Sequence, residues 1–142
     1  MRELSGKFTL MTGDELWDYL SKKAAEFREA YILSPFISIE GWKQIAALID
    51  GKPRKIQCHI LTRKDILSLA LQQLDLRVLQ DILTREAAAR YNSTYQLRWM
   101  PGLHAKMYLF KPHNIGVVGS SNLTKTGFSD HGLELNVLWE NS

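Results

Sequence analysis

The residues best suited to chemistry lie in the last third of the chain, between His104 and Asn136. An imidazole can act as a nucleophile or as a general acid or base near neutral pH. An ammonium group supplies a compact positive charge for an anion. His104 and Lys106 stand two residues apart, a spacing that puts both side chains on one face of a β-strand. The pair therefore predicts a site that faces an anionic group.

Two further polar groups follow this pair along the chain. The run IGVV leads into Gly119-Ser120-Ser121-Asn122, where a glycine permits a tight turn that exposes small polar side chains. In the apolar run 133–139, Glu134 and Asn136 alternate with leucine and valine. A carboxylate and a carboxamide are thus expected on one face of a last strand.

Taken together, His-x-Lys, Gly-Ser-x-Asn and a downstream acid resemble the signature of the phospholipase D superfamily. The wider stretch HAKMYLF…GVVGSSNLTKTGF…LELNV most resembles the single-motif nuclease branch, which includes small bacterial endonucleases, restriction enzymes and helicase-associated domains. One position departs from the pattern: the family usually has Asp seven residues after the histidine, and here that residue is Lys111. We interpret the missing Asp as a structural residue. The matching positions are His104, Lys106, Gly119, Ser120, Asn122 and Glu134.

The resemblance implies a phosphodiesterase that needs neither a metal nor another cofactor. His104 would attack phosphorus and form a phosphohistidine, while a second imidazole protonates the leaving oxygen. Lys106 and Asn122, supported by Ser120, would donate hydrogen bonds to the non-bridging oxygens. Glu134 would accept a hydrogen bond from the other ring nitrogen of the histidine.

This scheme needs two histidines, whereas the chain carries one set of motifs. Single-motif relatives pair two chains, so we expect a homodimer with the active site at its two-fold interface. Nucleic acid, DNA above all, is the expected partner, without a membrane. Arg63 and Lys64, just past a predicted strand, and Asn136 are candidates for substrate contacts.

Two other functions compete with the nuclease. A phosphodiesterase directed at phospholipids keeps the chemistry, but we find no basic amphipathic helix for a membrane surface and no second motif. A catalytically degenerate module for DNA binding or dimerisation, part of a helicase or restriction system, is favoured by Lys111.

Composition sets the general class. The 142 residues are 45% hydrophobic and 23% charged, with a formal net charge of +3. We expect one domain over residues 1–142, either whole or as a piece of a longer protein. No apolar run approaches the roughly 18 residues of a membrane span, and the N-terminus lacks a signal-peptide pattern. The single cysteine, Cys58, excludes an internal disulfide, so the cytoplasm is the expected compartment.

The elements that position these residues alternate between helix and strand. Helical spacing covers 13–28 and 39–50, and one or two helices are expected within 65–91. Strand-like runs occupy 30–37, 56–62, 96–100, 104–110, 114–119 and 133–139. This order predicts an α/β fold, a mixed β-sheet flanked by helices on both faces as in the phospholipase-D-like α-β-α sandwich. We interpret the other histidines as structural residues: His59, His113 and His131.

Overall fold

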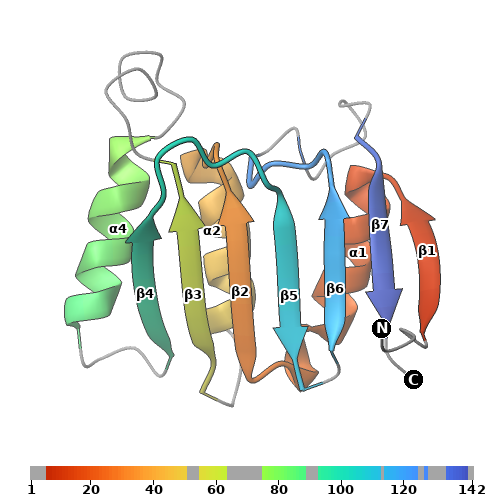
Figure 1. Ribbon diagram of the computed structural model, residues 1–142. Coiled ribbons are helices and arrows are strands. Elements are labelled where there is room, and N and C mark those ends of the chain that lie inside the picture. The colour runs from red at the N-terminus through yellow and green to blue at the C-terminus, as the bar shows by residue number, and fades with distance from the viewer. Residues whose placement is uncertain are drawn as a thin grey trace, which may run out of the picture.

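The computed structural model describes residues 6–50, 55–63, 75–88, 93–112, 114–124, 127 and 134–140. These residues build a seven-stranded sheet in the order β1-β7-β6-β5-β2-β3-β4 (Figure 1). β2, β3 and β4 run parallel, and all other neighbouring pairs are antiparallel, so the predicted mixed sheet is confirmed. The strands are β1 (Lys7–Met11), β2 (Glu29–Ser34), β3 (Gln57–Thr62), β4 (Thr94–Trp99), β5 (Met107–Lys111), β6 (Ile115–Gly119) and β7 (Asn136–Glu140).

The helices of the described residues are α1 (Gly13–Lys23), which continues into a short 3-10 turn (Ala24–Glu26), α2 (Ile39–Asp50) and α4 (Leu76–Ala87). α1 begins with a capping box, in which the carboxylate of Glu15 accepts a hydrogen bond from the Thr12 amide at 2.8 Å. α4 begins at Asp75, whose side chain accepts from the Arg77 amide at 2.9 Å. The remainder of the 65–91 prediction, 65–74 and 89–91, lies outside the described residues.

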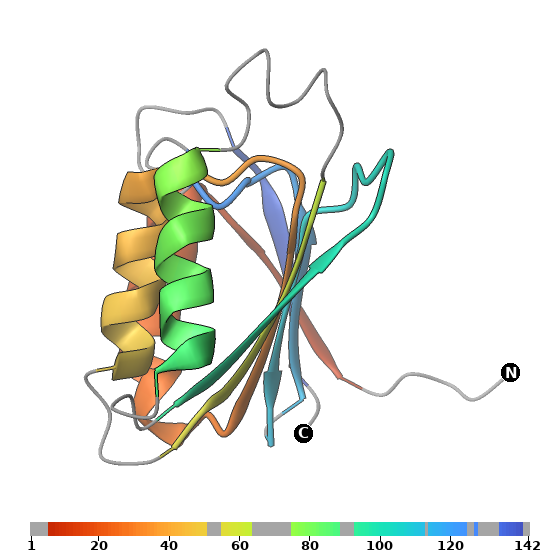
Figure 2. The same cartoon turned by 90° about the vertical axis from the view of Figure 1, so that its left-hand side faces the viewer.

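All three helices pack on the same face of the sheet (Figure 2). We expected helices on both faces, and in the described part of the chain the second face is uncovered. The sequence is misleading here because strands such as β2 (EAYILS) and β5 (MYLFK) are apolar on both sides. Continuous apolar strands usually indicate burial on both faces. Here the side chains that face away from the helices stay partly exposed.

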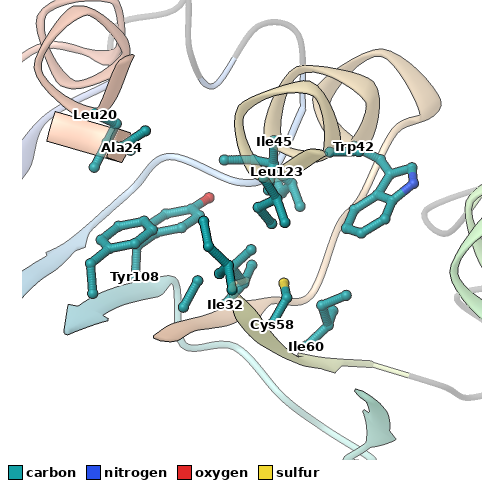
Figure 3. Close-up of a cluster of buried hydrophobic side chains, with 14 of the residues drawn as sticks. Leu20, Ala24, Ile32, Trp42, Ile45, Cys58, Ile60, Tyr108 and Leu123 are labelled. Atoms are coloured by element: carbon teal, nitrogen blue, oxygen red, sulfur yellow. The ribbon is translucent and has the colours of Figure 1, made fainter. Parts of the chain in front are cut away.

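The core fills the space between the helices and the sheet (Figure 3). Trp42 of α2 is fully buried and donates its indole N–H to Asp81 of α4 at 2.6 Å. Arg85 bonds the same carboxylate, also at 2.6 Å. This connects the two helices through a polar contact at the edge of an apolar layer. Burial raises the pKa of the Cys58 thiol to about 12, so this cysteine is a packing residue.

One strand was not predicted. β1 is an edge strand of five residues that pairs antiparallel with β7, with Phe8 opposite Trp139. Its sequence, KFTLM, is too short to stand out as an alternating pattern. No helix in the described part of the chain is both long enough and apolar enough to cross a bilayer.

Candidate active site

The predicted site residues gather at one end of the sheet. β2, β3, β4 and β6 end there, and β5 and β7 begin there (the upper edge in Figure 1). The chain must also return from β4 past β3 and β2 to reach β5, so residues 100–106 cross this same end. Figure 2 shows this crossover leaning towards the uncovered face of the sheet. The topology alone therefore brings the distant motifs together.

His104 and Lys106 lie in the crossover, immediately before β5. We expected a strand from residue 104, but β5 begins at Met107, so the pair stands on the connection just before the sheet. His104 is exposed and Lys106 is half-buried. The Lys106 ammonium lies 3.4 Å from the carbonyl oxygen of His104. The imidazole is thus accessible to a substrate.

A backbone hydrogen bond joins the two motifs. The Gly119 amide donates to the carbonyl of Lys106 at 3.4 Å, which extends the β5–β6 pairing by one step beyond Met107. The end of β6 is in turn tied to the start of β7. Ser120 donates its amide to the carbonyl of Leu135 at 3.1 Å and accepts the Leu135 amide on its hydroxyl at 3.0 Å. Since Leu135 follows Glu134, all three motif segments are connected through backbone contacts.

Asn136 occupies a different position from the one expected for a substrate contact. It is the first residue of β7, is only 1% exposed, and faces the helix side of the sheet. Its Oδ1 accepts the Ser121 amide at 3.3 Å, and its Nδ2 donates to the Ser121 hydroxyl at 2.8 Å. Both ends of the carboxamide are therefore used to hold the 119–122 turn. Glu134 precedes the strand and is half-buried.

Buried polar side chains of β2 and β5 also hold this turn in place. Ser34, at the end of β2, accepts the Leu123 amide on its hydroxyl at 2.9 Å and donates to the carbonyl of Phe36 at 2.8 Å. Tyr108 donates its hydroxyl to the carbonyl of Ser121 at 2.9 Å. Burial raises the pKa of Tyr108, and the carboxylate of Glu134 raises it further, so the phenol stays a neutral donor.

Two glycines allow the turn to sit this close to its neighbours. A Cβ on Gly119 would lie 2.5 Å from the carbonyl oxygen of Leu135. A Cβ on Gly41, in the first turn of α2, would lie 2.5 Å from the carbonyl oxygen of Leu123. Both distances are far below van der Waals contact, so any side chain would push the turn away. Sequence reasoning missed Gly41, because nothing near it in the chain connects it to the motifs.

The polar side chains fall into two groups according to their hydrogen bonds. Asn136, Ser121 and Ser120 are occupied in holding the turn. Asn122, in contrast, has a buried Oδ1 without a partner, and no hydrogen bond of its side chain to the described residues is found. A buried acceptor without a donor costs stability, and only a group with an N–H or O–H could complete it. The amide nitrogen of Asn122 and the imidazole of His104 make no hydrogen bond within the part of the chain that the structure describes.

The remaining predicted residues lie further out. Arg63 is half-buried, directly after β3 at the same sheet end, whereas Lys64 lies outside the described residues, as do His113 and His131. Lys111 closes the far end of β5, about 16 Å from Lys106 at the usual rise of a strand. Among the described residues, no cluster of His, Cys, Asp or Glu side chains could hold a metal ion.

Comparison with known proteins identifies the family. The family model described as "Cardiolipin synthase, PLD-like domain" matches residues 21–142. The chain therefore belongs to the family of PLD-like domains, the class that its mixed sheet and its His-x-Lys and Gly-Ser-x-Asn motifs indicate. A search of curated proteins gave no match.

Solved structures show the same fold at low identity. NucT from Helicobacter pylori is 15% identical with a TM-score of 0.62, over 96% of this chain and 87% of that one. Nuc from Salmonella typhimurium, a phospholipase D family member, is 14% identical with a TM-score of 0.55, over 96% and 83%. TrmBL2, an archaeal chromatin protein described with a novel mode of DNA binding, is 11% identical with a TM-score of 0.50, over 96% and 46%.

Proposed function

We propose that this chain is a metal-independent phosphodiesterase that cleaves nucleic acid, with DNA the preferred substrate. The observation that carries the proposal is the direct backbone link between Lys106 and Gly119. This link supports the proposal because it ties the segment that carries the exposed His104 imidazole to the turn that carries Asn122, whose amide nitrogen is a hydrogen-bond donor suited to an anion. Membership of the PLD-like family supports phosphodiester chemistry, and the DNA binding described for TrmBL2 supports a nucleic-acid partner.

The reaction proceeds by two displacements at phosphorus. The His104 imidazole attacks, a nitrogen–phosphorus bond forms, and the ester oxygen leaves with a proton from His104 of the partner subunit. Water then attacks phosphorus, gives a proton to that second imidazole, and releases His104. Lys106 and Asn122 donate to the non-bridging oxygens, where negative charge develops. Ser120 supports them mainly by positioning the turn, and Glu134 orients an imidazole.

The scheme requires a second copy of the chain. The crossover that carries His104 leans to the uncovered face of the sheet (Figure 2). The same face also carries exposed apolar side chains. A second copy that covered this surface would bring its own His104 to the same end of the sheet, because a two-fold axis pairs identical residues. Leaving such a surface in water is unusual for a monomer. The exposed side chains are Phe8, Leu10, Val118 and Val137, at 59%, 65%, 57% and 38%.

Cleavage of labelled single- and double-stranded DNA in the presence of EDTA tests the activity. We expect cleavage that survives chelation and disappears in His104→Ala. Loss of cleavage in EDTA would contradict the mechanism. Binding without cleavage by the wild-type chain would instead support the degenerate DNA-binding module, and cleavage of phospholipid vesicles alone would support a lipid substrate.

A further inference from the structure

A shallow groove of about 250 Å³ lies on the uncovered face of the sheet, away from the motif residues. Its floor is formed by apolar residues of β2 and β3, and its outer wall by β4. The strand register explains the arrangement, since Tyr31, His59 and Gln96 are opposite one another, as are Leu33, Leu61 and Arg98. The groove therefore has an aromatic and apolar floor and a polar, basic rim.

The aromatic pair is already stacked. The rings of Tyr31 and His59 lie 4.6 Å apart with an interplanar angle of 7°. The ammonium of Lys111 lies 5.5 Å from the centroid of the Tyr31 ring. The tyrosine hydroxyl donates to Glu29 at 2.7 Å. Lys111, the residue that departs from the family pattern, thus belongs to this stack and not to the catalytic end of β5.

The rim offers uncommitted polar groups. Arg98 and Gln96 are exposed, and neither makes an ion pair or side-chain hydrogen bond with the described residues. None of the described residues that line the groove carries a carboxylate. Covering this part of the face with an apolar partner would bury an unpaired guanidinium, which is costly. The groove therefore fits a ligand with a flat ring and a negative charge.

We propose that this groove binds one or more unpaired bases of a single-stranded nucleic acid, with Arg98 contacting the backbone phosphate. Stacking on aromatic rings accepts any base and requires that the base be unstacked from a duplex. An arginine on the rim supplies the phosphate contact that positions the strand. Gln96 donates and accepts hydrogen bonds at a base edge.

A strand bound in the groove can also reach the catalytic end of the sheet. β4 and β5 are three strand spacings apart, about 14 Å, and Leu33 of the groove stands opposite Met107, next to Lys106. At about 3.4 Å for each stacked nucleotide, up to four nucleotides span this distance. The role of the groove in presenting a strand for cleavage rests on the proposed nuclease function. Its binding of single-stranded DNA does not depend on that function.

Binding is therefore measured on His104→Ala chains in EDTA, by fluorescence anisotropy with a labelled single-stranded DNA of about twelve nucleotides. Tyr31→Leu removes the ring while keeping an apolar side chain, and we expect affinity to fall between about five- and a hundredfold. Tyr31→Phe keeps the ring and serves as the matched control, with wild-type affinity. Arg98→Ala is expected to lower the slope of log affinity against log salt by about 0.7, whereas Lys43→Ala, an equal charge loss on α2, leaves it unchanged.

Three results would overturn the proposal. The first is unchanged affinity of Tyr31→Leu chains whose thermal unfolding matches that of Tyr31→Phe. The second is equal or tighter binding of the corresponding duplex. The third is a change of oligomeric state in Arg98→Ala, which would assign the groove to a second copy of the chain. Absence of cleavage by the wild type would leave these binding results in place and would instead refute the catalytic function.

Discussion

Replacing Asn136 by alanine separates the residues that hold the active-site turn from those that meet the substrate. Asn136 is 1% exposed, and its carboxamide bonds both the amide and the hydroxyl of Ser121, which is itself fully buried. The substitution leaves both Ser121 groups without partners inside the protein. Each unsatisfied buried group costs about 1–3 kcal/mol, so we expect a loss of roughly 2–4 kcal/mol.

Urea unfolding followed by circular dichroism measures this loss. With a dependence on urea of about 2 kcal/mol per molar for a small domain, the midpoint should fall by roughly 1–2 M. Gln80→Ala, which removes an exposed carboxamide on α4, is the matched control and should change the unfolding free energy by less than about 0.5 kcal/mol. The turn of Asn136→Ala should also shift, and cleavage should fall by about a hundredfold, the usual result of a misplacement near 1 Å.

Asn122→Ala supplies the contrast. Its side chain has no partner among the described residues, so the unfolding free energy should stay within about 0.5 kcal/mol of the wild type while cleavage falls about 100- to 1000-fold. Unfolding of Asn136→Ala at the wild-type urea concentration would show that Asn136 does not hold the turn. Greater destabilisation by Asn122→Ala than by Asn136→Ala would show the same.

Three other substitutions test separate parts of the structure. Gly119→Ala places a methyl group 2.5 Å from the carbonyl oxygen of Leu135, so cleavage should drop by at least about tenfold. Cleavage by Gly119→Ala at the wild-type rate would show that the turn accommodates the methyl group. Val118→Asp puts a charge on the uncovered face and should yield inactive monomers in sedimentation. Leu83→Asp, which changes an exposed side chain of α4, should remain a dimer. A dimeric Val118→Asp would place the interface elsewhere. Lys111→Asp restores the usual family residue far from the site, so the cleavage rate should stay within about twofold. The free energy of unfolding should fall by about 0.2–1 kcal/mol, because the new carboxylate lies directly opposite Glu29. A large gain in cleavage would mean that Lys111 impairs this copy.

Much of the fold could be predicted because local patterns and final structure agree. The helix predicted at 39–50 is α2 with the same bounds, and the strand predicted at 56–62 is β3 within one residue. In contrast, the uncovered face could not be foreseen. Burial of one side depends on what packs there, and apolar side chains such as Leu33 and Leu109 look the same in sequence whether or not a helix covers them.

The candidate site was predictable as a set of residue types but not as a set of roles. Spacing indicated His104 and Lys106, the family resemblance added Asn122, and the structure brings their segments to one sheet end. Alternation also suggested that Glu134 and Asn136 face a substrate together. The outcome for Asn136 differs because β7 begins only at that residue and its even positions point to the helices. A pattern of period two shows which residues share a face of a strand but not which face packs against the helices.

If one His104 from each of two chains builds a single active site, cleavage depends on pairs of intact chains, and a mixing experiment measures this dependence. Wild-type and His104→Ala chains are unfolded together, refolded at fixed total concentration, and assayed for DNA cleavage in EDTA across a range of wild-type fractions. A shared site predicts that activity follows the square of the wild-type fraction, about a quarter of full activity in an equal mixture. A linear decline, about half of full activity at the same point, would show that each chain acts alone and that no active site is shared.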